Sequence, residues 1–379
     1  MATSSTIMRT SIIKHAICMT VVFTAVAPTY AFALNLEQSA TLPFGIEYET
    51  NPQLVSNNRQ SVKRTIFTPS YSLMATQNND QFFANLKLNI ERSSNQTASA
   101  NREDPNFSTG WTHDYETGQF GIIANFSEQS TRTSEFDDNG LVTNNNNTRK
   151  TKSLGGNWST ELSDRYSLSV NLNATDVEFD GVSAGLNDYK NKSLSSQVNY
   201  SINEKVNSFA RLSLSRFEPV NTSSTNFRSL DIGANWTLSE NFTVSASGGV
   251  NETGGSNGAS GWQADVSSVY TTERTSTTAG LSRSRSPSGE GIIRESNQLK
   301  AGWSYLLSEK ANIGVNFNYR ENLGVDSNDT MRISADYTRA LAPEWDFKVS
   351  ASHRNRDDNI SDVSSNTLSA TIIYKLPDF

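Results

Sequence analysis

The histidines are the first residues in this chain that could carry out acid–base chemistry. The chain has three, His15, His113 and His353, and Asp357 and Asp358 follow the last of them. An imidazole beside carboxylates can serve as a general acid or base, but only with a nucleophile, metal or substrate cleft within reach. Neither His113 nor His353 begins an H-x-S arrangement, and an acidic loop beside one histidine is usually a solvated rim. We therefore predict that the protein is not an enzyme.

A run of oxygen-bearing side chains at Asp137-Asp138-Asn139-Gly140 could bind calcium, which prefers carboxylate and amide ligands. The competing interpretation is a plain turn, because Asp and Asn before Gly favour turns for backbone reasons. The turn is the better interpretation, so we predict no metal site and no cofactor. The single cysteine, Cys18, permits neither a disulfide nor a thiolate metal site.

The first 33 residues have the organisation of a secretory signal peptide. Arg9 and Lys14 form a basic start, an apolar run covers 17–27, and Ala31-Phe32-Ala33 resembles a cleavage site. The apolar run is too short to span a bilayer. We predict that residues 1–33 are cleaved and that 34–379 form one domain. The chain carries a formal net charge of -7, and removal of the two basic residues makes it more acidic. This charge argues against nucleic acid as a partner.

The sequence pattern of the mature chain predicts that β-strands position its side chains. The stretch Leu299–Arg320 illustrates this pattern. Apolar residues occupy alternate positions up to Leu307 and again from Ile313, with a short turn between the two runs. Strand side chains alternate between two faces, so this pattern predicts a hairpin with one apolar and one polar face. The chain is also rich in Ser, Thr and Asn. A sheet with lipid on one face and water on the other explains both the alternation of apolar residues and this polar composition.

Alternating runs of this kind recur along the chain, and their connections are alternately tight and longer. We predict an all-β fold, a single closed antiparallel transmembrane β-barrel of about 18 strands, with a range of about 16–20. An even count places both termini on the short-turn, periplasmic rim. The predicted strands are 40–50, 64–76, 81–92, 106–116, 119–129, 150–162, 166–177, 189–202, 206–217, 226–238, 242–252, 261–272, 275–285, 294–307, 311–321, 329–341, 345–355 and 364–376. The longest connection, 130–149, is a candidate constriction of the lumen.

Aromatic residues cluster beside the tight turns on the apolar parity of their strands. Membrane barrels carry such rings where the apolar band meets the lipid headgroups. The alternative is that rings simply favour strands. The predicted periplasmic girdle comprises Tyr115, Trp158, Tyr166, Tyr200, Trp236, Phe242, Tyr270, Tyr305, Tyr337, Trp345 and Tyr374.

The polar face of the strands should line a water-filled lumen, because a barrel of this width cannot be filled by its own side chains. Basic residues gather on this face in the last five predicted strands. The charged residues predicted to line the lumen are Lys300, Arg320, Arg332, Asp336, Lys348, Arg354 and Lys375. Two interpretations stay open: a field that attracts anionic sugars, or charges that pair with one another and keep the wall hydrated.

Both ends of the mature chain carry family resemblances. The last alternating strand is followed by a terminal Phe379, which resembles the assembly signal read by the barrel-assembly machinery of Gram-negative bacteria. The segments GIEYETNPQL at 45–54 and TPSYSL at 68–73 resemble the bacterial outer-membrane β-barrel proteins associated with exopolysaccharide synthesis and exosortase systems, the β-barrel porin type 2 group. The resemblance implies an outer-membrane location, lipid-bilayer contact, and polysaccharide and periplasmic export components as partners.

The predicted function is a non-enzymatic conduit or surface component for exopolysaccharide export. One alternative is a general diffusion porin for small solutes, which is expected to have a long inward-folding constriction loop and a trimer interface. Only 130–149 is a candidate for such a loop. Another alternative is a structural or adhesive surface barrel that presents its loops.

Overall fold

The computed structural model describes residues 34–143, 146–181, 185–254, 259–324, 327–358 and 361–376. The chain divides into the units Met1–Asn35 and Leu36–Phe379. The predicted signal peptide and the terminal Phe379 lie outside the described residues. Everything that follows concerns the second unit, apart from the first residue of β1.

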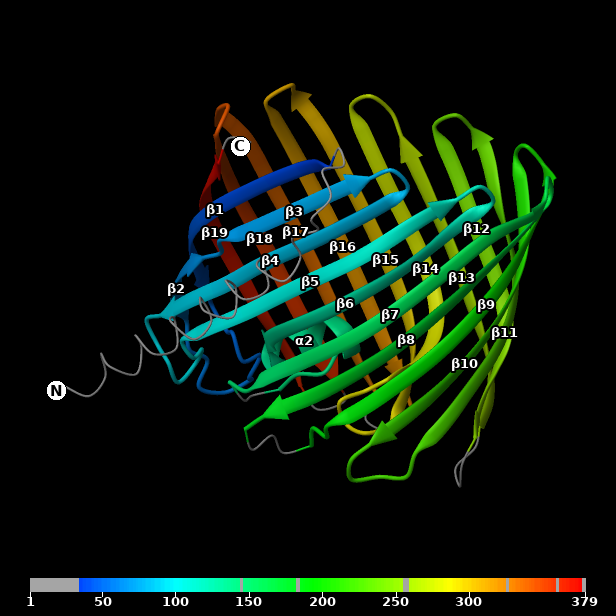
Figure 1. Ribbon diagram of the computed structural model, residues 1–379. Coiled ribbons are helices and arrows are strands. Elements are labelled where there is room, and N and C mark those ends of the chain that lie inside the picture. The colour runs from blue at the N-terminus through cyan, green and yellow to red at the C-terminus, as the bar shows by residue number, and fades with distance from the viewer. Residues whose placement is uncertain are drawn as a thin grey trace. The chain divides into compact units, whose positions relative to one another are not determined.

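Antiparallel strands arranged as a barrel make up this unit (Figure 1). The strands are β1 (Asn35–Glu49), β2 (Val62–Phe67), β3 (Ser70–Gln77), β4 (Asp80–Ser93), β5 (Arg102–Tyr115), β6 (Gly118–Ser130), β7 (Thr148–Ser163), β8 (Tyr166–Asp180), β9 (Tyr189–Asn203), β10 (Val206–Pro219), β11 (Thr225–Ser239), β12 (Phe242–Gly254), β13 (Ala259–Thr271), β14 (Thr275–Pro287), β15 (Ile293–Ser308), β16 (Ala311–Leu323), β17 (Asn328–Ala342), β18 (Trp345–Asp358) and β19 (Asp362–Leu376). One helix, α2 (Thr131–Asn139), separates β6 from β7.

The barrel closes by pairing of its first and last strands. β1 and β19 run antiparallel in a continuous register from Ala40 opposite Leu376 to Glu49 opposite Thr367. Closure satisfies the backbone donors and acceptors of both edges, which a bilayer interior requires because it offers no water. The predicted closed antiparallel barrel is therefore confirmed.

The structure has one strand more than the eighteen predicted, because one predicted strand is divided into two. β2 and β3 correspond to the single strand predicted over 64–76, and both pair with β4 in the same register, Phe67 opposite Ile90 and Ser70 opposite Lys87. Between them stands Pro69, which has no backbone N–H to give to the ladder. The wall thus has eighteen strand positions, as predicted, although nineteen strands are assigned.

Large apolar side chains cover the outside of the barrel. On β1 the even-numbered residues Leu42, Phe44, Ile46 and Tyr48 are all strongly exposed to the surroundings, whereas Glu49, of the opposite parity, is buried inside. This is the inverse of a soluble protein, and it suits a wall whose outer face contacts lipid. Among the described residues, no helix is long and apolar enough to cross a membrane.

Many of the aromatic residues predicted to form a girdle contact one another across neighbouring strands near the short turns. Ring centroids lie 4.9 Å apart for Tyr166 and Tyr200 and 4.8 Å apart for Trp345 and Tyr374. The hydroxyl of Tyr115 donates to the carbonyl of Ser159 at 2.8 Å. Their role as a periplasmic girdle stays a prediction.

Candidate solute pathway

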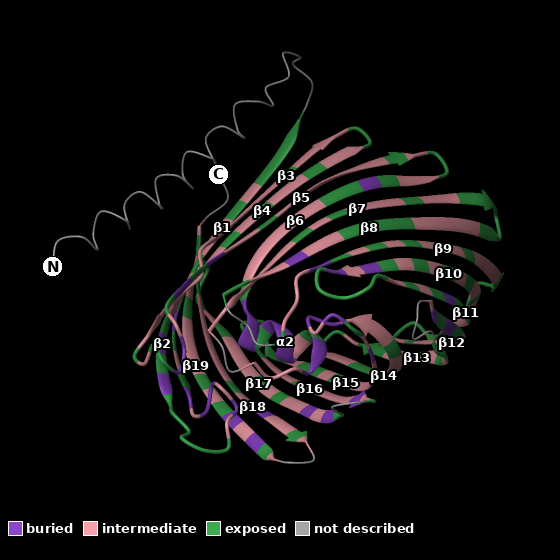
Figure 2. Ribbon diagram, turned by 90° about the horizontal axis from the view of Figure 1, so that it is seen from below, coloured by how far each residue is buried: buried purple, intermediate pink, exposed green. Residues whose placement is uncertain are grey.

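Helix α2 lies within the ring of strands rather than outside it (Figure 2). The sequence predicted a long connection here, and the helix itself was not foreseen. Asp137 and Asp138, interpreted above as part of a turn, belong to the last turn of the helix. Gly140 ends the helix with φ of 66°, a left-handed conformation that costs glycine little, and its N–H donates to the carbonyl of Phe136.

Side chains of the opposite wall hold the carboxyl end of α2. Arg332 of β17 donates from Nη1 to both carboxylate oxygens of Asp137, at 2.7 and 2.9 Å. Arg320 of β16 donates to the carbonyl of Asp138. The amide of Asn322 donates to the carbonyl of Asn139 at 2.9 Å. A helix that begins after β6 is therefore fixed to β16 and β17, ten and eleven strands later in the chain.

The middle of α2 rests on a small apolar cluster. Phe136 is 4 % exposed and packs with Leu54, Val142 and Val363. The guanidinium of Arg354 lies over the Phe136 ring, 5.3 Å from its centroid. Because an aromatic face attracts a cation, this contact adds to the apolar packing that fixes the helix.

The amino end of α2 joins a buried charge cluster on the wall, formed by Glu49 and three arginines. Glu49 pairs with Arg64 of β2, with Arg354 of β18, and with Arg132 of the helix, whose Nη1 lies 3.2 Å from the carboxylate. All four side chains are at most 6 % exposed. Glu49 is the shared partner that compensates their charge, because unpaired buried cations are costly.

The far side of α2 contacts a second inward segment. Glu135 accepts from the Asn139 amide at 3.0 Å and lies 3.3 Å from Arg149 of β7. A side chain at Gly289 would approach within 2.9 Å of the Glu135 carboxylate, so the 288–292 connection packs closely here. Asn187, in turn, donates its backbone N–H to the Gly289 carbonyl at 2.6 Å.

Burial shifts the ionisation of two helix residues. Burial raises the pKa of Glu135, although the neighbouring Arg149 opposes the change. Burial also lowers the pKa of Arg132, and the cations Arg64 and Arg354 act in the same direction while Glu49 opposes them. Both shifts follow from moving charged groups out of water.

A polar cavity of about 440 Å³ lies between α2 and the wall formed by β1, β2, β4 and β16–β19. Five cationic side chains and four acidic ones line it, with serine hydroxyls between them. Its charged lining residues are Glu47, Glu49, Arg64, Glu91, Arg132, Arg332, Asp336, Lys348 and Arg354. The cavity can therefore hold a small hydrophilic solute within reach of both charge signs.

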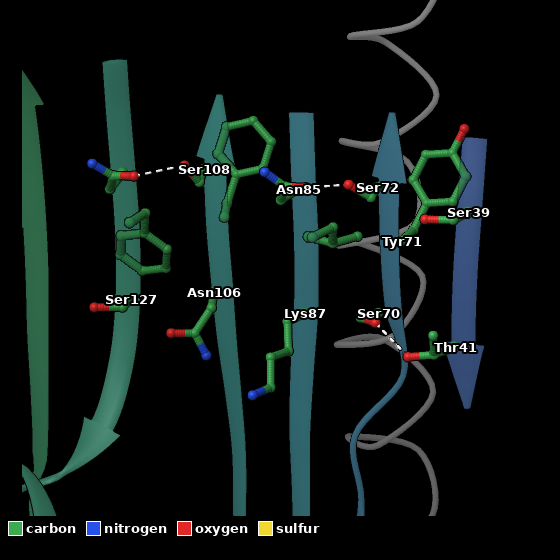
Figure 3. A pocket seen from close by; sticks show the side chains of 14 residues that line it. Ser39, Thr41, Ser70, Tyr71, Ser72, Asn85, Lys87, Asn106, Ser108 and Ser127 are labelled. Atoms are coloured by element: carbon green, nitrogen blue, oxygen red, sulfur yellow. Dashed lines mark hydrogen bonds between the residues drawn. The ribbon is translucent and has the colours of Figure 1, made fainter. Parts of the chain in front are cut away.

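The wall beyond this cavity is a network of hydroxyls and amides (Figure 3). Thr41 and Ser70 share a hydrogen bond of 2.7 Å, and Ser108 donates to Asn125 at 2.7 Å. Lys87 extends its amine among these groups (Figure 3). Such neutral polar groups exchange hydrogen bonds with water at little net cost.

The predicted lumen charges divide into three sets. Arg320, Arg332 and Arg354 contact α2 directly, as described above. Lys348 lies 3.7 Å from Asp336, and Lys375 lies 2.7 Å from Asp346, so these pair along the wall. Lys300 is exposed. The pairing of Lys348 and Lys375 along the wall agrees with the interpretation that the lumen charges pair with one another. Neither interpretation predicted the contacts with α2.

Several functional residues were missed because their partner is the helix or a rim segment. Arg132, Arg149, Asn322 and Asn328 hold α2 in place. The only available signal was the concentration of charge inside 130–149, which resembles an ordinary polar loop. His353, the residue considered for acid–base chemistry, contacts Asn366 at 2.8 Å. Among the described residues, no group of three or more His, Cys, Asp or Glu is placed to hold a metal ion.

Comparison with solved structures identifies the kind of barrel. The chain is similar to OccAB4 of Acinetobacter baumannii, with a TM-score of 0.53, 10% identity, and coverage of 91% of this chain and 98% of that one. It is also similar to Pseudomonas aeruginosa OpdK, solved with vanillate, with a TM-score of 0.51, 10% identity, and coverage of 91% and 99%. It is similar as well to OccK2 of Pseudomonas aeruginosa, with a TM-score of 0.51, 12% identity, and coverage of 90% of this chain and 98% of that one. No protein-family model matches the chain, and no curated sequence does.

These similarities establish the fold, a barrel of the outer-membrane porin type. They contradict the predicted exopolysaccharide conduit, because one of the matching barrels was solved with a small solute, vanillate. The structure supplies the physical reason for the correction. One of the features expected above for a diffusion porin, a segment that folds inward, is present as α2.

Proposed function

We propose that the protein is a diffusion channel for small hydrophilic solutes in the outer membrane of a Gram-negative bacterium. The observation that carries the proposal is the anchoring of α2 inside the lumen, from the Glu49 cluster at one end to Arg332 and Asn322 at the other. A helix tied to both sides narrows the pathway to small molecules and leaves a polar route beside it.

The charges beside the helix favour anions modestly. Cationic side chains outnumber acidic ones by one around the 440 Å³ cavity, and several of the cations are held by carboxylates. The resulting field attracts anions at close range and is screened by salt, whose Debye length is about 8 Å at physiological ionic strength. We therefore propose weak anion selectivity rather than exclusive anion transport.

Reconstitution in planar bilayers tests both parts of the proposal. The purified protein should conduct ions, and its reversal potential in a potassium chloride gradient should indicate preference for chloride. Lys348→Glu should shift the preference toward potassium, because Lys348 lines the cavity without touching α2. Lys310→Glu, in the short turn between β15 and β16, is the control and should change little. A protein that inserts but does not conduct would refute the proposal.

The proposal includes the route by which the protein reaches the membrane. Residues 1–33 act as a cleaved signal peptide, and the barrel-assembly machinery recognises the carboxyl-terminal strand with Phe379. Both termini then face the periplasm. The resemblance of 45–54 to the β-barrel porin type 2 group supports an outer-membrane location. Sequencing the amino terminus of the purified protein tests the cleavage: Leu34 should be the first residue.

A further inference from the structure

The outer face of β13–β16 carries a groove that the solute pathway does not use. The groove has a volume of about 410 Å³, and its apolar lining includes Trp262, Val266, Leu281 and Leu299. Trp262, Val266 and Leu281 are 53 %, 45 % and 59 % exposed, respectively. The neighbouring residue of opposite parity, Gln263, instead donates to Asp231. The groove therefore opens toward the surroundings of the barrel, where lipid is expected.

A cation stands at the long-loop end of this groove. The guanidinium carbon of Arg283 lies 4.3 Å from the centroid of the Trp262 ring, within the range of a favourable cation–aromatic contact. Arg283 is four residues from the end of β14. The side chain thus sits where an apolar wall meets the polar rim.

The donors of Arg283 are only partly satisfied within the protein. Its Nη2 donates to Glu295, whereas its Nε is buried and, among the described residues, has no hydrogen-bond acceptor. Glu295 is shared, because Arg285 donates to it from Nε at 3.0 Å and from Nη2 at 2.9 Å. Two guanidinium groups thus face one carboxylate. One carboxylate cannot neutralise two guanidinium groups, so this pair keeps an excess positive charge, which favours an anionic acceptor from the headgroup layer.

The next charged residue across the outer face from Arg283 is the acidic Glu321, which already has a hydrogen-bond partner. Glu321 of β16 accepts from the amide of Asn297 at 2.7 Å. Asn297 stands opposite both Arg283 and Glu321 in the ladder, so it separates the two. The cationic end of the groove is therefore local, with its excess charge on the pair Arg283 and Arg285.

We propose that this groove binds an anionic lipid, with a phosphate oxygen of its headgroup accepting from Arg283 and an acyl chain lying over Leu281 and Leu299. The site combines an apolar trough with one cation at its polar end, which is the complement of a lipid with a charged headgroup. The inference depends on the proposed membrane location and is independent of solute conduction.

Native mass spectrometry of the purified full-length protein in detergent tests the site. The probes are dioleoylphosphatidylglycerol and the zwitterionic dioleoylphosphatidylcholine, each added in equimolar amount. We expect the wild type to retain the anionic lipid preferentially. Arg283→Gln should reduce that adduct by about threefold or more, because it removes a charge-assisted hydrogen bond. Leu281→Trp should reduce adducts of both lipids by filling the groove.

Arg228→Gln is the matched control. Arg228 of β11 stands opposite Leu214 and Glu252 at the same end of the barrel, away from the groove, and should not alter lipid binding. Heat-modifiable mobility on gels confirms that each variant is folded, and bilayer conductance shows separately whether the channel works. Equal anionic-lipid adducts in all four proteins would overturn the proposal. A dimer that Leu281→Trp abolishes would overturn it in favour of a second copy of the chain as the occupant.

Discussion

The ion pair between Arg332 and Asp137 offers a quantitative test of the constriction. Arg332 contacts both oxygens of the carboxylate, at 2.7 and 2.9 Å, but the two side chains are 38% and 39% exposed. Solvent screens such a pair, so it should be worth about 0.5–1 kcal/mol. Since 1.36 kcal/mol corresponds to a factor of ten, Arg332→Ala should raise the population of detached α2 about two- to fivefold.

Single-channel recording in planar bilayers measures this change. We expect Arg332→Ala to spend about two to five times longer in a higher-conductance substate than the wild type, with a smaller difference in high salt. Lys348→Ala is the control, because it removes the same charge from the same wall and pairs with Asp336 instead of the helix. A double-mutant cycle with Asp137→Ala isolates the pair. Identical substate occupancy in wild type and Arg332→Ala, or strict additivity in the cycle, would contradict the anchoring role.

Four further expectations concern stability and pH. Val315→Arg should destabilise the barrel by about 2–4 kcal/mol in urea unfolding, whereas Asn316→Arg, toward the lumen, should be tolerated; equal effects would refute the facing assignment. Glu49→Gln should cost about 3–5 kcal/mol, since it leaves buried arginines without their carboxylate. Phe136→Ala should increase the time spent in the higher-conductance substate, because it removes apolar packing from α2. The stability of the barrel, measured by its heat-modifiable mobility on gels, should not change. The pKa of Glu135 is raised in the folded protein. The stability that Glu135 contributes to the seating of α2 is therefore present at low pH and is lost as the pH rises through that raised pKa. In Glu135→Gln the occupancy of the higher-conductance substate should depend less on pH over this range.

Periodicity in the sequence determined the barrel. Two-residue alternation in runs such as 311–321 assigned one face to lipid and the other to water, and alternating short and long connections gave the number of wall positions. The closing pair of β1 and β19 followed, because a bilayer leaves no edge unpaired. The proline at position 69 is visible in the sequence, but whether it ends a strand or only interrupts the ladder depends on how both neighbours pair.

Tertiary structure alone decided which segment lies inside the ring of strands. Alternation assigns Arg332 and Arg354 to the inner face, but it cannot show that their partners lie about 200 residues away on a connection. The helical turn of 131–139 has no strong local signal, because it is stabilised by contacts with the wall rather than by its own propensity. In the sequence the basic residues suggested either a field that attracts anionic sugars or charges that pair with one another. In the structure three of them, Arg320, Arg332 and Arg354, contact α2. A strand pattern records which side a residue faces, and only the folded barrel determines what it meets there.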